Sequence, residues 1–171
     1  MSGAPGTVTG PILSAGRGSH SGAQGDAETN GSRPHRSYVE LAAHPGAVSH
    51  ARRCTRQALA AWRLDSIADD AALVVSELVT NAVTATLEMQ AAAPVALYVA
   101  LEHGRLYVLV WDCCPDLPAR RDHASDAESG HGLELSGRGL RLVTALSADW
   151  GACAQPGGEV TWARFDPEAA P

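Results

Sequence analysis

The chain has 171 residues, 45% of them hydrophobic, and a formal net charge of -6. This length suffices for one globular domain with a core but is short for two. The acidic balance disfavours a protein that binds nucleic acid by neutralising phosphates, and no stretch reaches the roughly 18 consecutive apolar residues of a membrane span. The start also lacks a charged segment followed by an apolar one. We therefore expect a cytoplasmic protein with a protein or small-molecule partner and no direct contact with nucleic acid or membrane.

The N-terminal segment, residues 1–36, is rich in Gly, Ser, Pro and Ala and has almost no large apolar side chains. Such a segment cannot bury enough apolar surface to offset the entropy that it would lose on ordering. The predicted organisation is therefore a disordered tail at 1–36, one folded domain at 37–166 and a short disordered end at 167–171.

The first half of the domain is predicted to contain one short strand and two helices. The strand spans 37–44, and apolar residues at helical spacing predict a first helix over 45–64. Asp65 and Ser66 can cap a second helix over 67–86. This second helix is apolar nearly all round, so we expect it to be well buried.

The second half is predicted to contain two β-hairpins separated by a long loop and a third helix. The first hairpin pairs 94–102 with 105–111 across the turn signal at His103 and Gly104. Residues 113–136 lose periodicity, which predicts a loop longer than most in a compact domain. A helix at 138–147 and strands at 149–154 and 159–165 complete the chain.

The predicted order of elements, β-α-α-β-β-loop-α-β-β, decides the fold class. It lacks the regular β-α alternation that a doubly wound sheet needs. It favours an α+β two-layer sandwich, with a mixed, mostly antiparallel sheet and helices on one face.

The four cysteines show no paired Cys-x-x-Cys spacing, and the seven histidines are scattered. Neither a zinc site nor a disulfide framework is therefore supported. Two interpretations remain for the adjacent Cys113 and Cys114: a redox-sensitive pair, or small half-buried side chains.

Glu77 and Asn81 lie four residues apart in Ser-Glu-Leu-Val-Thr-Asn-Ala, within the most apolar predicted helix. A helix places both side chains on one face. A buried carboxylate without a partner is costly, so this pair is either satisfied internally or faces a polar cavity. On spacing alone, an exposed pair on the helix surface is the simpler interpretation.

Asp112 ends a hairpin strand, and two Gly-x-Gly-Leu sequences follow at 130–133 and 137–140. A carboxylate at a strand end can accept a hydrogen bond from the exocyclic amino group of adenine. Glycines before a helix let backbone N–H groups approach a phosphate, and only Gly137 and Gly139 lead directly into an amphipathic helix. Taken singly, a turn Asp and flexible-loop glycines are the simpler interpretations.

The order of these features is more specific than any one of them. A helical Glu-x-x-x-Asn, a strand ending in Asp, a long loop, Gly-x-Gly at a helix start and a final hairpin resemble the GHKL ATPases. Within that superfamily the sequence is most similar to the short bacterial anti-sigma-factor serine/threonine kinases and their stand-alone relatives. The similarity runs from about Tyr38 to Phe165 and is carried by five ordered segments at 77–82, 110–112 with Pro118, 134–143, 149–151 and 158–163.

This resemblance implies a Bergerat-type fold that binds ATP with Mg2+. By analogy, Glu77 is the general base, Asn81 coordinates magnesium, and Asp112 recognises adenine. The family's usual Gly or Ser two residues after that Asp is replaced by Cys114, which is small enough to fit. The analogy assigns further nucleotide contacts to Cys114, Gly137, Arg138, Gly139, Leu140 and Thr161.

The function that the resemblance implies is an ATP-binding regulator, namely a serine/threonine kinase of the partner-switching kind. It would bind a sigma factor or similar regulator, phosphorylate a small anti-anti-sigma-like antagonist protein, and form a homodimer. The alternative is an ATP-binding protein-interaction module without productive phosphotransfer. The catalytic half of a histidine kinase would need a phosphoacceptor His on a dimerising hairpin, whereas His50 on the first helix lies inside the domain.

Overall fold

The computed structural model describes residues 35–114 and 134–167, with the side chains of 134–138 outside the description. Residues 1–34 of the predicted N-terminal tail and most of the predicted long loop also lie outside the described residues. The last two residues of that predicted tail, His35 and Arg36, belong instead to the first strand. In chain order the elements are β1 (His35–Leu41), α1 (Gly46–Ala61), the short 3-10 turn η1 (Asp65–Ile67), α2 (Ala68–Glu88), β2 (Val95–Glu102), β3 (Arg105–Asp112), α3 (Glu134–Leu146), β4 (Asp149–Gln155) and β5 (Gly158–Phe165). The predicted order is confirmed, with η1 added.

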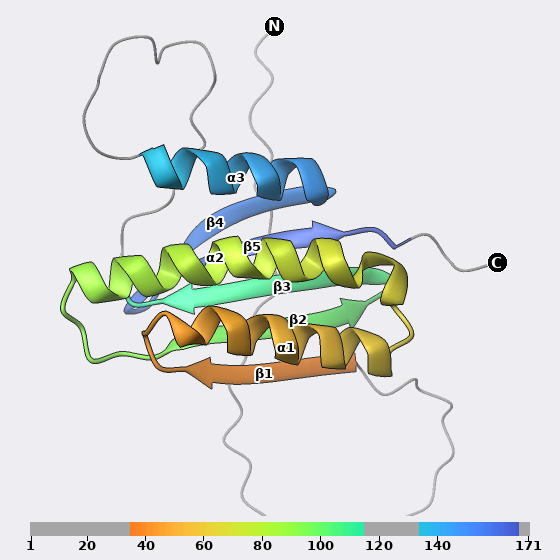
Figure 1. Ribbon diagram of the computed structural model, residues 1–171, viewed down its shortest axis with the longest axis horizontal. Coiled ribbons are helices and arrows are strands. Elements are labelled where there is room, and N and C mark those ends of the chain that lie inside the picture. Colours follow the sequence, from red (N-terminus) through yellow and green to blue (C-terminus); the bar gives the residue numbers. More distant parts are fainter. Residues whose placement is uncertain (1–34, 115–133, 168–171) are drawn as a thin grey trace, which may run out of the picture. The chain divides into compact units, whose positions relative to one another are not determined.

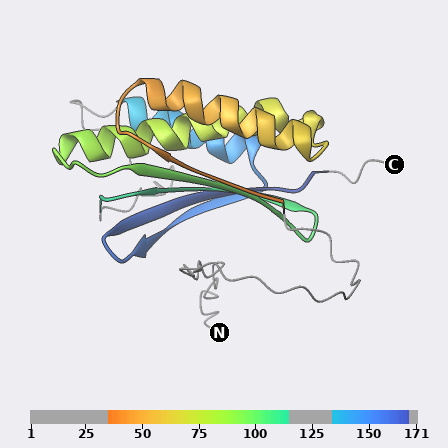
Figure 2. The same ribbon diagram turned by 90° about the horizontal axis from the view of Figure 1, so that it is seen from below.

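The described strands form one five-stranded sheet in the order β1-β2-β3-β5-β4. Every pairing is antiparallel, including that of β3 with β5, which are separated in sequence by α3 and β4. The three helices lie together on one face of this sheet (Figures 1 and 2). The predicted α+β sandwich is confirmed, and its sheet is antiparallel throughout rather than mixed.

Helix α2 is the centre of the helix layer. It lies between α1 and α3 in Figure 1 and contacts both of them as well as β2, β3 and β5. Its fully buried side chains include Val74, Val75 and Val79. By length and composition the segment Asp65–Glu88 could also cross a membrane, but half of its most apolar window is buried in this fold. Packing against two helices and the sheet therefore accounts for its apolar character.

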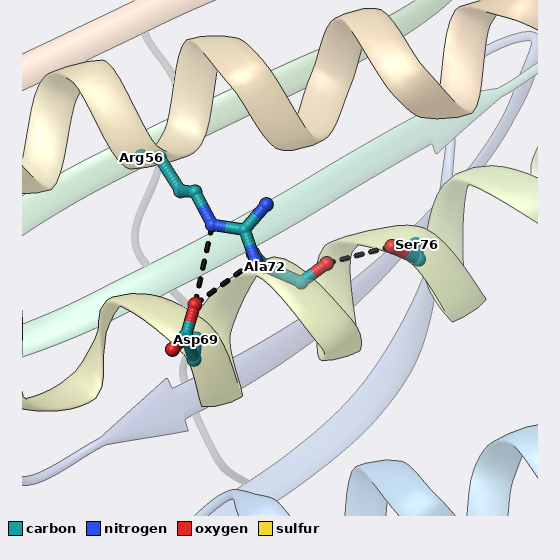
Figure 3. Close-up of polar contacts among 4 residues, drawn as sticks. All are labelled: Arg56, Asp69, Ala72 and Ser76. Carbon is teal, nitrogen blue, oxygen red and sulfur yellow. Dashed lines mark hydrogen bonds and ion pairs between the residues drawn. The ribbon is translucent and has the colours of Figure 1, made fainter.

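The start of α2 differs from the sequence prediction. Neither Asp65 nor Ser66 caps the helix through its side chain; instead the chain enters α2 through η1. Asp69 lies in the first turn, where a negative charge complements the helix dipole. Its Oδ1 accepts hydrogen bonds from Arg56 on α1, at 2.9 Å from Nη2 and 3.3 Å from Nε (Figure 3). Both side chains are exposed, so this pair contributes at most about 1 kcal/mol to stability.

The alternation of side chains along the strands decides which residues face the helices. On β3 the helix-facing residues are Leu106, Val108 and Val110, which belong to the hydrophobic core, followed by Asp112 at the strand's end. On β5, Ala163 pairs with Val108 and Phe165 pairs with Leu106, so these two core residues continue the same face. The core therefore ends, at one edge, in a polar group that faces the helix layer.

Candidate functional site

Glu77 and Asn81 share one face of α2, as their spacing predicts, and both are half-buried. The hydroxyl groups that precede each of them are satisfied within the helix. Ser76 Oγ donates to the carbonyl oxygen of Ala72 and Thr80 Oγ1 to that of Ser76, each at 2.7 Å (Figure 3 shows the first bond). Neither hydroxyl therefore donates its hydrogen to the Glu77 carboxylate or to the side-chain oxygen of Asn81.

Gly139 on α3 lies directly against the Glu77 side chain. A Cβ atom added at Gly139 would lie 2.5 Å from Glu77 Oε2 and 3.7 Å from Glu77 Cβ, although real Cβ atoms essentially never come within 3.0 Å of another heavy atom. Gly139 is itself buried. The absence of a side chain at this position thus lets the α3 backbone approach the carboxylate closely.

The position of the glycines relative to the helix start differs from the prediction. Helix α3 begins at Glu134, four residues before the predicted start, so Gly137 lies inside it rather than just before it, and Gly139 lies in its second turn rather than at its start. Glycine costs only about 1 kcal/mol in a helix interior and does not by itself end a helix. Because helical N–H groups beyond the first turn bond within the helix, phosphate contacts by these two glycines require this turn to unwind.

Asp112, the last residue of β3, lies at the opposite end of the candidate site. It is 4% exposed, and its Oδ1 accepts a hydrogen bond from the Cys114 N–H at 2.8 Å. Burial raises the pKa of the Asp112 carboxyl above its ordinary value, and the Cys114 hydrogen bond opposes that shift. The main-chain N–H of the buried Cys114 thus orients the carboxyl group.

Strand β5 adds two further polar side chains beside Asp112. Glu159 is the direct partner of Asp112 in the β3–β5 register and is 5% exposed; Thr161 pairs with Val110 and is 8% exposed. Gly158 makes this approach feasible, because a Cβ atom there would overlap the carbonyl oxygen of Asp112. The sequence analysis missed Glu159, although a carboxylate two residues before Thr161, on the face of β5 that carries core residues, was an available signal.

The two ends of the site lie along α2. The Asp112 end lies near Thr86 of α2, because Cys113, the residue after Asp112, contacts it. The Cys113 thiol is 4.0 Å from the hydroxyl of the fully buried Thr86. Thr86 follows Glu77 by nine residues, which at about 1.5 Å per residue separates them by about 13 Å along the helix, with Asn81 between them. A nucleoside triphosphate can span such a distance, with its base near Asp112 and its phosphates near Asn81.

The remaining predicted site residues lie on α3. Leu140 is half-buried and packs against the hydrophobic core, so its structural contribution is clear. Arg138 lies in the helix, but its side chain is outside the description. The structure therefore brings Gly139 to Glu77 and groups Cys114 and Thr161 with Asp112, while a phosphate contact by Arg138 stays a prediction.

An antiparallel sheet under three helices, with polar groups spaced along the central helix, is the arrangement that the resemblance to nucleotide-binding sandwiches of the Bergerat type implies. Residues 41–165 match the family of histidine kinase-like ATPase domains, and the chain belongs to this family. The predicted GHKL relationship is thereby confirmed. Family membership also supports ATP as the bound nucleotide.

Among solved structures, the chain is similar to the RsbU and RsbW domains of Rv1364c from Mycobacterium tuberculosis. The TM-score is 0.55 and the sequence identity is 19%, which shows a shared fold. The match covers 76% of this chain, which spans only 32% of the length of that structure. No curated protein matches the chain.

The side chains present fit ATP with a magnesium ion. Within the described ranges, no three His, Cys, Asp or Glu side chains gather as in a metal site built by protein alone. Mg2+ usually takes one or two protein oxygens and completes its octahedron with phosphates and water. Asn81 can supply such an oxygen from its half-buried position on α2.

Proposed function

We propose that this protein is an ATP-dependent serine/threonine kinase that acts as an anti-sigma-factor-like regulator. The observation that carries the proposal is the Glu77 carboxylate, which lies on the same helix face as Asn81 and against the bare backbone of Gly139. A carboxylate placed beside the phosphates of ATP can act as a general base, whereas a nucleotide-binding module needs none at this position.

The proposed chemistry assigns one task to each end of the site. Asp112 holds the adenine amino group and so fixes the nucleotide along α2. Asn81 would hold the Mg2+ that accompanies the triphosphate, and this ion would supply positive charge to the phosphate oxygens during transfer. Glu77 accepts the proton of the Ser or Thr hydroxyl on the protein substrate as that oxygen bonds to the terminal phosphorus of ATP. The bond between this phosphorus and the bridging oxygen to the second phosphate breaks, and ADP leaves with the electron pair. Phosphoryl transfer needs little more from a protein than such positioning and charge stabilisation.

The proposed partners are a sigma factor or similar regulator and a small anti-anti-sigma-like antagonist protein that receives the phosphoryl group. This assignment is supported by the sequence resemblance to anti-sigma-factor kinases and by the fold that the chain shares with a structure containing an RsbW domain. The acidic net charge of -6 agrees with a protein partner rather than with direct binding to nucleic acid. A homodimer and a cytoplasmic location stay predictions.

Phosphotransfer from labelled ATP tests the proposal. The full-length protein with Mg-ATP should transfer the terminal phosphoryl group to a Ser or Thr of a candidate antagonist. Glu77→Gln should lower the transfer rate by at least about 100-fold, the usual contribution of a positioned general base. Glu88→Gln is the matched control, because Glu88 is an exposed carboxylate at the end of the same helix. Wild-type protein that binds ATP but labels no candidate would contradict the kinase assignment.

A second candidate function is a nucleotide-regulated binding module that performs no productive transfer. The helical start of α3 favours it, because this conformation holds Gly139 against Glu77 and keeps both glycines within a helix. Complementation in cells separates the two functions. A Glu77→Ala variant that still performs the cellular task would support the module, and loss of the task would support the kinase.

A further inference from the structure

Helix α1 is a basic element in an acidic chain. The segment 41–64, which contains α1, has four Arg and no Asp or Glu, although the whole chain has a net charge of -6. Arg53 and Arg56 are exposed, and Arg52 is half-buried. Within the described part of the chain, Arg56 pairs with Asp69, whereas neither Arg52 nor Arg53 has an ion-pair partner. Such a cluster of one sign on a chain of the opposite net charge favours a partner that carries negative charge.

Helices α1 and α2 pack together and run in opposite directions (Figure 1). Their alignment is given by Arg56 Nη2, which donates a hydrogen bond to Asp69 Oδ1 at 2.9 Å (Figure 3). One turn back along α1 from Arg56 is Arg52, and one turn forward along α2 from Asp69 is Leu73. Because residues four apart share one helix face, Arg52 and Leu73 lie opposite each other across the same boundary between the helices.

Leu73 is an exposed apolar side chain beside the candidate site. It is 43% exposed, whereas the next two residues of α2, Val74 and Val75, are fully buried in the core. Leu73 also precedes Glu77 by four residues, so the two side chains share one face of α2 and their Cβ atoms lie about 6 Å apart. Leu73 therefore lies between the basic side of α1 and the proposed catalytic carboxylate.

The composition of this surface indicates the chemistry of its partner. Arginine side chains bind carboxylates through two parallel hydrogen bonds, and an exposed leucine gains from contact with another apolar group. Stable protein interfaces combine such an apolar anchor with a polar rim and are enriched in Arg. Nucleic acid is a poorer fit, because its affinity comes mainly from many neutralised phosphates and an apolar anchor adds little to that. The surface thus fits a protein segment with an apolar side chain flanked by Asp or Glu.

We propose that Arg52, Arg53 and Leu73, which together we name the Arg-Leu surface, form the docking site for an acidic segment of a partner protein. Leu73 packs against an apolar side chain of that segment, and the two arginines pair with carboxylates beside it. The proposal rests on the partner-binding function proposed above and gives the partner a chemical class. A segment docked there lies one helical turn from Glu77, where its Ser or Thr would meet the terminal phosphate of ATP.

Binding of two labelled synthetic peptides to the full-length protein tests the proposal. One peptide carries Leu side chains flanked by Asp and Glu, and the other is identical except that Lys replaces every Asp and Glu. Fluorescence anisotropy without nucleotide should show that the wild type binds the acidic peptide at least about tenfold more tightly, because like charges across an interface repel. The double variant Arg52→Glu, Arg53→Glu should reverse this preference, and Arg52→Gln, Arg53→Gln should abolish it. Equal binding of both peptides by the wild type would overturn the proposal.

Leu73→Asn tests the apolar part of the surface. It should weaken binding of the acidic peptide by about tenfold, which corresponds to about 1.4 kcal/mol. Leu87→Asn is the matched control, because Leu87 is 50% exposed on the same helix but about 21 Å further along it. Arg105→Glu is the control for charge, because Arg105 is exposed on β3. Both controls should bind the acidic peptide as the wild type does, and thermal unfolding identifies the variants that fold. Full binding by folded Leu73→Asn, or an equal loss in Leu87→Asn, would contradict the assignment of this surface.

The possible outcomes also separate this inference from the proposed function. A wild-type protein that prefers the acidic peptide but transfers no phosphoryl group to any candidate would refute the kinase assignment alone. Phosphotransfer to a candidate antagonist, together with equal binding of both peptides, would refute the Arg-Leu surface alone. A single-stranded oligonucleotide that binds more tightly than the acidic peptide, and loses that binding in Arg52→Gln, Arg53→Gln, would assign the basic side of α1 to nucleic acid and overturn the proposal.

Discussion

The two ends of the candidate site are built in different ways. The Asp112 end lies on strands β3 and β5, where the antiparallel register brings Asp112, Glu159 and Thr161 to one buried corner. The Glu77 end lies on helices, where Glu77, half-buried on α2 with Asn81 one turn further along, lies against Gly139 of α3. Ladder hydrogen bonds fix the first end, whereas packing between two helices, with Gly139 against Glu77, positions the second. We therefore expect the Asp112 end to be rigid and the Glu77 end to be adjustable.

The adjustable end has a physical cause in the sequence of α3. Gly137 and Gly139 lie in its first two turns, where each glycine weakens the helix by about 1 kcal/mol relative to Ala. The same lack of side chains lets α3 approach Glu77. The feature that allows close packing over the carboxylate thus also lowers the free energy needed to unwind this turn.

The largest effect is expected from Gly139→Ala. The added methyl group would displace the Glu77 carboxylate, and a misplacement of about 1 Å in a catalytic group can lower a rate by about 100-fold. The free energy of unfolding should change by less than about 1 kcal/mol, because the higher helix propensity of Ala offsets the crowding of a flexible side chain. Labelled-ATP transfer and urea unfolding measure the two quantities.

Ala145→Gly is a suitable control for Gly139→Ala, because Ala145 is exposed on α3. It should lower stability by about 1 kcal/mol and leave phosphotransfer unchanged. Full phosphotransfer by Gly139→Ala would show that the contact with Glu77 does not position the carboxylate, and the contrast between the two ends would weaken.

At the Asp112 end, Asp112→Asn should weaken ATP binding by at least about tenfold. The variant keeps one oxygen that can accept the Cys114 N–H but loses the negative charge that favours the adenine amino group. Isothermal titration with ATP measures the loss. Binding equal to that of the wild type would place adenine elsewhere.

The smallest effect concerns stability and its pH dependence. Because burial raises the pKa of Asp112 in the folded state, the folded protein binds this proton more tightly than the unfolded chain does. Asp112 therefore contributes stability below its unfolded pKa, and this contribution is lost as pH rises through the folded pKa. Nucleotide-free Asp112→Asn should thus match or exceed wild-type stability at neutral pH, with that advantage disappearing in acid. An Asp112→Asn variant less stable than the wild type at neutral pH would contradict the predicted direction of this stability change.

The parts of the fold that depend on local sequence were predictable. The turn at His103 and Gly104 has positive φ at both residues, +50° and +76°, so its sequence signal and its geometry agree. The turn signal in the sequence therefore placed Asp112 correctly at the end of β3, the second strand of this hairpin. The continuous helical spacing of apolar residues likewise placed Glu77 and Asn81 together on α2.

The features that the sequence did not predict depend on distant parts of the chain or on small energy differences. Glu159 reaches Asp112 only through the pairing of β3 with β5, which no local pattern specifies. The predicted start of α3 was wrong because glycine was interpreted as a helix boundary. The free-energy cost of a glycine inside a helix is small enough for α3 to begin at Glu134 and continue through both glycines. The predicted cap at Asp65 was wrong because the chain enters α2 through η1, and no side chain caps the start of α2.

The most direct test of the central claim is the binding of ATP and ADP to the full-length protein, with and without Mg2+, for the wild type and for Asn81→Ala. Asn81 is half-buried on α2 in the same helix as Glu77, and its side chain is the proposed protein ligand of the metal. We predict magnesium-dependent ATP binding by the wild type that weakens by at least about tenfold in Asn81→Ala. Equal, magnesium-independent binding by both proteins, or no ATP binding by the wild type, would contradict the account.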